Sequence, residues 1–249
     1  MLPQPTVDKM NSMRLEPMVE AWRGLEQDAN AHALTFDDKM ALMVDRLWTS
    51  RQNLAFQQRL KRAKLRNGAC VEDIDYQNGG GLDRNMLRSL CSSGWVERHE
   101  NIFITGPTGV GKSYLGCALA QKACRDGYQI FYWRATALFR DLAIARADGS
   151  LRYLLARLGR TDVLVVDDWA MAPMPETERR DFWEICEDRY QVRSTILTSQ
   201  VPVVKWHDQI GDATVADGIL DRLVHNSHRI ELKGESMRKG RGKRADSTT

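Results

Sequence analysis

The sequence lacks any apolar run that approaches the roughly 20 residues of a membrane span. Residues 1–17 contain no uninterrupted apolar core, which argues against a signal peptide. Cysteines are few, five in 249 residues, and no two of them form a CxxC pair. These absences predict a protein of a reducing cytoplasm, without a membrane partner, a disulfide framework or a zinc knuckle.

A large net charge is also absent, because 36 Lys and Arg residues nearly balance 33 Asp and Glu residues and leave +3. The distribution is uneven, since residues 51–66 carry +6 with no acid and residues 233–244 carry +5. The rest of the chain therefore carries −8. Basic clusters of this size can neutralise nucleic-acid phosphates without reading sequence. The alternative is a solvated helix face and a frayed tail.

Apolar spacing predicts helices in the first part of the chain. A stripe that includes Trp22 indicates one helix over residues 10–30. Thr35 is the expected N-cap of a second helix, with an apolar face formed by Met40, Met43, Val44, Leu47 and Trp48. We expect Trp22 and Trp48 to be core residues. Asn-Gly at residues 67–68 is a break signal, so residues 1–67 are predicted to form a small helical domain for DNA binding or oligomerisation.

Beyond residue 81, short apolar strands alternate with helices. The strands are expected at residues 101–105, 129–133, 163–167, 195–199 and 228–232. This alternation is typical of an α/β fold with a parallel sheet covered on both faces. We place this domain at residues 68–232 and a flexible basic tail at residues 233–249.

The first of these strands runs directly into GPTGVGKS, residues 106–113. The motif matches GxxxxGK[ST] in full and lies between a strand and a helix, the context that it requires. Glycines let the backbone N–H groups face phosphates, and the helix adds its positive N-terminal end. Lys112 is expected to pair with the β- and γ-phosphates, and Ser113 to ligate Mg²⁺. The alternative is a chance glycine turn.

The strand at residues 163–167 ends in a pair of carboxylates. Asp167 is the expected partner of Mg²⁺, through water. Asp168 can reach a nucleophilic water and act as the base that polarises it. The alternative makes Asp168 a solvated residue at a strand end.

Two further polar residues are candidates for the same site. Gln200 follows a strand, at the edge where carboxyl ends border the ligand crevice, so it either senses the γ-phosphate or caps the strand. Arg222 stands between two apolar pairs at the edge of a buried helix. It is either an arginine finger for a neighbouring subunit's ATP or one half of a surface salt bridge with Asp217 or Asp221.

Taken together, these motifs resemble the IstB family of insertion-sequence helper ATPases, from about residue 10 to residue 239. The basic helical segment in front of the phosphate loop makes the resemblance more specific than the loop alone. It is carried by LTFDDKMALMVDRLWTSRQNLAFQQRLKRAKL, GLDRNMLRSL, WVERHENIFITGPTGVGKS, VLVVDDW, TILTSQ and GILDRLVHNSHRIELKGESMRK.

The resemblance implies an AAA+ P-loop ATPase of the initiator and helicase-loader clade, similar to DnaC and DnaA, that uses ATP and Mg²⁺. It implies a cytoplasmic bacterial protein, nucleoid-associated when active, that assembles on duplex DNA with little sequence preference. The assembly is an ATP-dependent homo-oligomer with ATP between subunits, and it assists a transposase encoded by the same element.

Site residues carry over by motif match. The implied nucleotide-binding residues are Gly106, Pro107, Thr108, Gly109, Val110, Gly111, Lys112, Ser113 and Tyr114. The implied metal residues are Ser113 and Asp167, and the implied catalytic residues are Asp168, Gln200 and Arg222. The expected DNA-binding residues are Arg51, Arg59, Lys61, Arg62, Lys64 and Arg66. Arg238 either contacts phosphate in cis or belongs to the basic tail.

One departure and two other functions remain open. Asp168 replaces the commoner Glu, so either the loop compensates for the shorter side chain or hydrolysis is slow. The runner-up function is a DnaC-like loader of a replicative helicase. A small-molecule P-loop kinase is a third reading, although such an enzyme has little use for the basic segment at residues 51–66.

Overall fold

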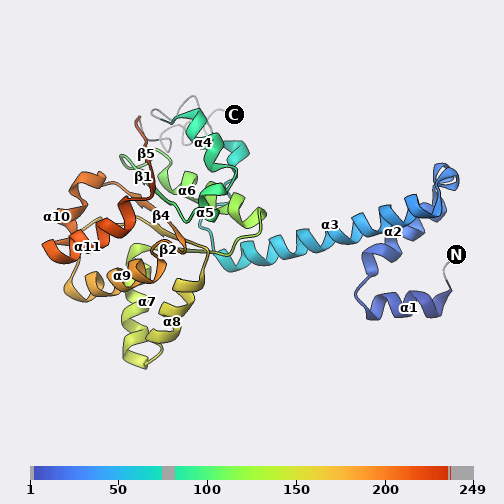
Figure 1. The fold of residues 1–249 in the computed structure, drawn as a ribbon, viewed down its shortest axis with the longest axis horizontal. Coiled ribbons are helices and arrows are strands. Elements are labelled where there is room, and N and C mark those ends of the chain that lie inside the picture. The colour runs from blue at the N-terminus through green and yellow to red at the C-terminus, as the bar shows by residue number, and fades with distance from the viewer. Residues whose placement is uncertain (1–2, 75–81, 235, 237–249) are drawn as a thin grey trace, which may run out of the picture. The chain divides into compact units, whose positions relative to one another are not determined.

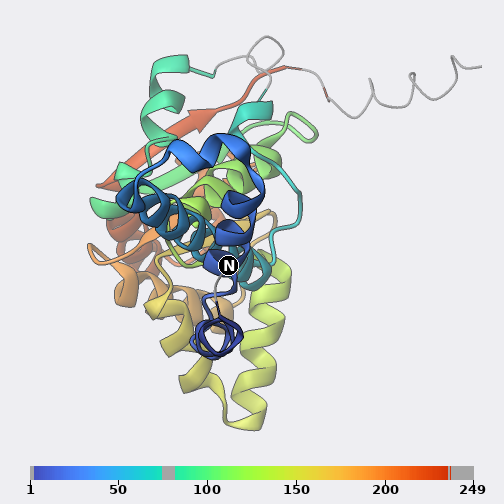
Figure 2. The same cartoon turned by 90° about the vertical axis from the view of Figure 1, so that its right-hand side faces the viewer.

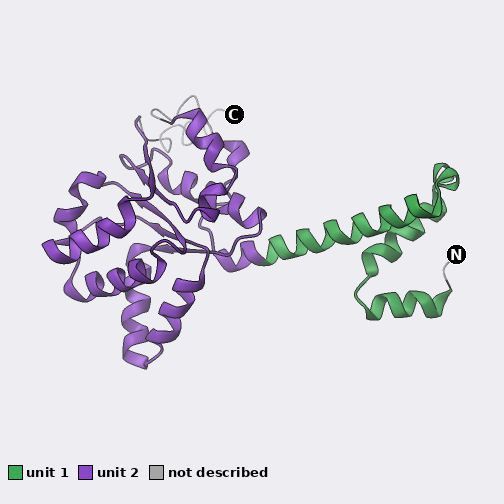
Figure 3. Ribbon diagram, in the orientation of Figure 1, with its two compact units in different colours: residues 1–58 green, residues 59–249 purple. Residues whose placement is uncertain are grey.

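The computed structural model describes residues 3–74, 82–234 and 236. The chain divides into two compact units, Met1–Gln58 and Arg59–Thr249, coloured separately in Figure 3. The division falls inside a helix, ahead of the boundary predicted at residue 67, because residues after Gln58 pack on the second unit. Most of the predicted tail at residues 233–249 lies outside the described residues, namely residues 235 and 237–249, which include Arg238.

The first unit is helical, as expected, but its helices differ from the prediction. It holds α1 (Gln4–Ser12), α2 (Glu16–Gln27), the short 3-10 helix η1 (Ala29–Ala33) and most of α3 (Phe36–Ala63). The single helix predicted over residues 10–30 is wrong. The chain turns at Arg14, whose φ is 60°, and Pro17 then fits the first turn of α2, where its missing N–H removes no bond.

Helix α3 begins where Thr35 predicts it. The Thr35 hydroxyl accepts from the backbone N–H of Asp38 at 3.2 Å, and the Asp38 carboxylate accepts from the Thr35 N–H at 3.1 Å. This reciprocal pair satisfies two donors at the helix start. The expectation of a buried Trp48 is wrong, since Trp48 is 63% exposed although Met43 is buried. Within this unit α1 packs on α2 and α2 on η1.

The second unit contains the predicted parallel sheet. Its strands are β1 (Asn101–Thr105), β2 (Ile130–Arg134), β3 (Val163–Asp167), β4 (Ser194–Ser199) and β5 (Ser227–Glu231). They lie in the order β2-β3-β4-β1-β5, and every neighbouring pair is parallel (Figure 1). All five lie within one residue of the predicted positions, which confirms the α/β fold.

Helices cover both faces of this sheet. They are α4 (Arg84–Leu90), α5 (Gly94–Glu97), α6 (Lys112–Arg125), α7 (Ala135–Asp148), α8 (Leu151–Arg160), α9 (Glu176–Arg189), α10 (Trp206–Ile210) and α11 (Ala213–Val224), with 3-10 turns η2 (Val71–Asp73) and η3 (Val203–Lys205). Gly116 of α6 lies against Ile104 and Ile196. Because strand residues alternate faces, their neighbours Phe103 and Leu197 face the opposite side, toward the cluster formed with α7 to α11. Helices α7 and α8 run side by side in both views (Figures 1 and 2).

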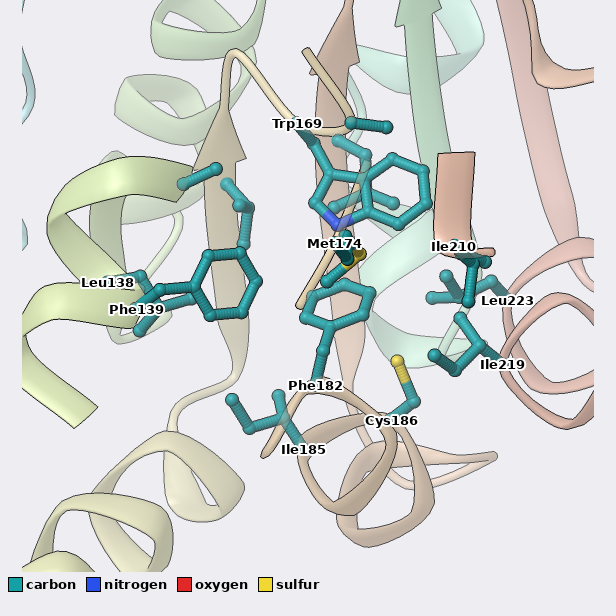
Figure 4. Packing of buried hydrophobic residues seen from close by; sticks show 14 of the residues in the cluster. Leu138, Phe139, Trp169, Met174, Phe182, Ile185, Cys186, Ile210, Ile219 and Leu223 are labelled. Atoms are coloured by element: carbon teal, nitrogen blue, oxygen red, sulfur yellow. The ribbon is translucent and has the colours of Figure 1, made fainter. Parts of the chain in front are cut away.

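A large core cluster lies beneath the end of β3. Trp169, Phe182 and Met174 meet there with Ile210 and Leu223 (Figure 4). Trp169 is fully buried and packs edge-on against Trp206 at 4.6 Å between ring centroids. The residue next to the acidic pair is therefore anchored in the core, which fixes the chain direction at the site. None of the described helices combines the length and apolar character needed to cross a bilayer.

Candidate nucleotide site

The phosphate loop joins β1 to α6. Its three glycines have φ values of 144° at Gly106, 88° at Gly109 and 100° at Gly111, a region that favours glycine. Gly106 also allows a close approach, because a Cβ built there would lie 2.3 Å from the backbone oxygen of Leu232. Both the loop conformation and its packing against the chain after β5 therefore require glycine.

The loop ends in the first turn of α6, which carries the other predicted nucleotide ligands. The Lys112 ammonium donates to the backbone oxygen of Pro107 at 2.8 Å, and Lys112 is only 6% exposed. The lysine therefore curls back over its own loop, where phosphates would lie. Ser113 and Tyr114 follow, half-buried in the same turn. Val110 is buried and anchors the loop.

The Asp167 carboxylate is the centre of a network of hydrogen bonds at the site. It is fully buried at the end of β3. Its Oδ1 accepts from the Ser113 hydroxyl at 2.7 Å and from the Thr198 hydroxyl. Its Oδ2 accepts from the Tyr132 hydroxyl at 2.6 Å and lies 3.7 Å from Nη1 of Arg66. Burial, with the bond to Asp167 second, raises the pKa of Tyr132. Tyr132 therefore stays a hydrogen-bond donor to the carboxylate.

Asp168 is held in an unusual backbone conformation beside this network. Its φ is 57°, a left-handed value that costs a non-glycine residue about 1–2 kcal/mol. Thr198 pins the turn, since its hydroxyl accepts from the Asp168 N–H at 3.1 Å and its backbone oxygen accepts from the Trp169 N–H at 2.8 Å. The Asp168 carboxylate faces outward and accepts from Arg134 at 2.9 Å. The bond to Asp168 raises the pKa of Arg134.

Gln200 also reaches the loop. Its side-chain oxygen accepts from the Thr108 hydroxyl at 2.7 Å. This bond joins the chain after β4 to the phosphate loop. Its role as a sensor stays a prediction.

Arg222 lies apart from this cluster. Its guanidinium pairs chiefly with Glu187 of α9, and also lies 3.9 Å from Asp221. The bond to Glu187 raises the pKa of Arg222, and that bond also lowers the pKa of Glu187. Among the described residues its contacts join α11 to α9 and do not include the phosphate loop. The arginine-finger role therefore depends on a neighbouring subunit.

The basic segment is divided between two kinds of surroundings. Arg59 donates through Nε to the backbone oxygen of Cys124, at the end of α6, at 2.8 Å. Arg66 lies next to Asp167, as described above. The other candidates for DNA contact are exposed: Arg51, Lys61, Arg62 and Lys64.

Three residues of the site were missed from the sequence: Tyr132, Arg134 and Thr198. Arg134 and Thr198 lie at or next to the carboxyl ends of β2 and β4, whereas Tyr132 lies in the middle of β2. Arg134 is the register partner of Asp167 across β2 and β3. For Arg134 and Thr198 the signal available was their position near a strand end. The order of the strands, which decides which ends are neighbours, was not readable from the pattern.

The chain matches the family described as IstB-like ATP binding protein over residues 8–245. It belongs to that family. An insertion sequence ATP-binding protein of Sinorhizobium fredii, y4pL, is 46% identical over 98% of this chain and all of its own length. This IstB-like chain is therefore an ATP-binding protein of the insertion-sequence class.

Solved structures with a similar fold include DnaI and the replication initiator DnaA. The crystal structure of DnaI has a TM-score of 0.57 at 20% identity and covers 67% of this chain and 92% of its own. The replication initiator DnaA bound to AMPPCP and single-stranded DNA has a TM-score of 0.58 at 21% identity, covering 73% and 56%. At these identities the likeness supports the fold alone, a parallel sheet flanked by helices, as expected.

The residues present fit an ATP-bound divalent cation. A serine hydroxyl and a buried carboxylate, 2.7 Å apart, supply the hard oxygen ligands that Mg²⁺ prefers. The glycine loop and the N-terminal end of α6 supply N–H donors for phosphate. Ser113 and Asp167 are therefore the pair that would hold the cation.

Proposed function

We propose that this IstB-like protein is a Mg²⁺-dependent ATPase that assembles on duplex DNA with little sequence preference and assists the transposase of its insertion sequence. The observation that carries the proposal is the combination of a complete phosphate site with an exposed basic segment attached directly to it. The insertion-sequence relative supports the transposition setting. The DnaA neighbour, bound to AMPPCP and single-stranded DNA, supports coupling of nucleotide to DNA.

ATP binding in this proposal uses the chain's own loop and helix. The loop N–H groups and Lys112 neutralise the phosphates, while Ser113 and Asp167 would hold Mg²⁺, which adds positive charge at the γ-phosphate. Asp168 accepts a proton from the attacking water once its carboxylate turns from Arg134. Gln200, which is hydrogen-bonded to Thr108, would respond to loss of the γ-phosphate.

DNA binding uses the exposed cations at the end of α3. Lys61, Arg62 and Lys64 contact phosphates, which gives affinity without base readout. A single subunit makes few such contacts. Assembly of several subunits multiplies them, because each additional subunit binds a strand already held close by its neighbours.

Sedimentation velocity with a non-hydrolysable ATP analogue, Mg²⁺ and random duplex DNA tests the proposal. We expect large assemblies only when nucleotide and DNA are both present, and none with Lys112→Ala. An unchanged monomer under all conditions would overturn it.

Arg222 offers a sharper test of ATP between subunits. Glu187→Gln releases Arg222 from α9, whereas Arg222→Ala removes the guanidinium. If Arg222 acts on a neighbour's ATP, only Arg222→Ala abolishes turnover, and Glu187→Gln retains it. Equal losses of stability with unchanged turnover would assign Arg222 to the tie between α9 and α11.

The loader function remains the second candidate, because a similar fold occurs in the solved structure of the DnaC helicase loader. A pull-down that compares the transposase of the same element with a replicative helicase separates the two. Capture of the helicase alone would favour the loader.

A further inference from the structure

Arg66 stands out among the cations of the basic segment because it is directed at the nucleotide site. Its Nη1 lies 3.7 Å from Oδ2 of Asp167. The Asp167 side chain is fully buried, whereas that of Arg66 is 40% exposed. One end of this contact is therefore fixed in the core, and the other is free to move into solvent.

The backbone that carries Arg66 is fastened along α6. Helix α3 ends next to Lys64, whose φ is 53°. Before it, Arg59 bonds the end of α6 through Cys124. After it, Glu72 pairs with Arg125 at 2.6 Å. The buried residues Ala63 and Ala69 flank the stretch between these ties. Only the side chain of Arg66, and not its backbone, has room to respond to the site.

Asp167 offers a limited number of acceptor positions. A carboxylate has about four lone-pair sites, and Ser113, Thr198 and Tyr132 already donate to it. Arg66 is its only cationic neighbour within 4 Å among the residues that the structure describes. A divalent cation held by Ser113 and Asp167 would take over the negative charge of Asp167 and repel the guanidinium.

We propose that Arg66 is a positioning residue that holds Asp167 until Mg²⁺ and nucleotide bind, and then swings out to join Lys61, Arg62 and Lys64 as a phosphate contact. The second half rests on the proposed DNA-binding function. The DNA-binding segment thereby gains a cation only in the nucleotide-bound state. The side chain of Arg66 alone thus couples the nucleotide site to the DNA-binding segment.

The first half is tested without DNA, by titrating Mg²⁺ against binding of a fluorescent ATP analogue to the full chain. Arg66→Gln removes the competitor, so the half-saturating Mg²⁺ concentration should fall about three- to fivefold, the range for a partly exposed ion pair. Arg62→Gln, an exposed neighbour, is the matched control and should not change it. Arg66→Lys should restore the wild-type value. Identical Mg²⁺ dependence in wild type and Arg66→Gln would overturn the inference.

The second half is tested by the salt dependence of DNA binding. With Mg²⁺ and the non-hydrolysable analogue, Arg66→Gln should reduce the slope of log affinity against log salt by about 0.9 per subunit. Without nucleotide, wild type and Arg66→Gln should have the same slope. Arg62→Gln should differ from wild type in both states. Equal slopes for wild type and Arg66→Gln in the nucleotide state would overturn this half.

The two sets of outcomes separate this inference from the proposed function. If the wild-type chain binds no DNA but Arg66→Gln shifts the Mg²⁺ titration, the proposed function fails and the competition at Asp167 stands. If DNA binding depends on ATP but the Mg²⁺ titration does not shift, only the inference fails.

Discussion

Thr198→Val is the substitution that most directly tests how the acidic pair is held. Val keeps the shape of the side chain and removes the hydroxyl. That hydroxyl donates to Asp167 and accepts from the N–H of Asp168, and Thr198 is fully buried. The substitution therefore removes two hydrogen bonds at a site that water does not reach.

The expected loss follows from those two bonds. A hydrogen bond to a charged group contributes about 1.5–3 kcal/mol, and an unpaired buried N–H costs about 1–3 kcal/mol. Since the effects share one side chain, we expect the free energy of unfolding to fall by about 3 kcal/mol. With a slope of roughly 2–3 kcal/mol/M for a domain of this size, the urea midpoint should fall by about 1 M.

The assay is urea unfolding at pH 7, followed by circular dichroism, with ATP turnover measured on the same preparations. Thr105→Val is the matched control, because Thr105 is buried at the end of the adjacent strand β1, and its hydroxyl has no hydrogen bond to the described residues. Turnover should fall in Thr198→Val because the turn at Asp168, with its φ of 57°, loses an anchor. Equal shifts in the two variants would refute the reasoning.

Three further substitutions probe the site and its support. Asp168→Asn should keep ATP binding and lower phosphate release at saturating ATP about 100-fold; normal turnover would show that another residue polarises the water. Arg134→Gln should raise basal phosphate release about threefold, because the Asp168 carboxylate is then free to face the water; an unchanged rate would show that the Arg134–Asp168 pair does not limit turnover. Glu100→Gln tests pH dependence. The bond from Arg98, and less strongly that from His228, lowers the pKa of Glu100, so the charged form stabilises the fold above the ordinary Glu pKa of about 4.3. The stabilisation is lost as pH falls through the depressed pKa. Wild type should exceed the variant by about 1 kcal/mol at pH 7, and the gap in urea midpoint should close as pH falls below the depressed pKa; a constant gap would contradict this.

The sheet was predictable because each of its central strands is short, apolar and followed by a polar or glycine-rich turn. That pattern depends only on local sequence, and it located β1 and β3 to the residue. The predicted approach of Ser113 and Asp167 rested on motif context rather than on spacing, since 54 positions separate them.

The misses have a different cause. Arg134 and Thr198 could be placed at strand ends, but their meeting with Asp168 depends on β3 lying between β2 and β4. The order of strands is a property of the whole fold and leaves no local mark. The prediction that Trp48 is buried was wrong for a different reason. The helical spacing correctly predicted the helix, but a periodic apolar face does not reveal whether another element covers it.

The structure also changes how the basic segment should be tested. A charge reversal at Arg59 would remove its bond to Cys124 and so disturb the end of α6. A charge reversal at Arg66 would place a second carboxylate beside that of Asp167. Weaker DNA binding in either variant could therefore arise from damage to the nucleotide site. Lys61 and Arg62 are exposed, so loss of DNA binding after their reversal, with ATP binding intact, bears on phosphate contact alone. Phosphate contact by the basic segment is therefore tested most directly at Lys61 and Arg62.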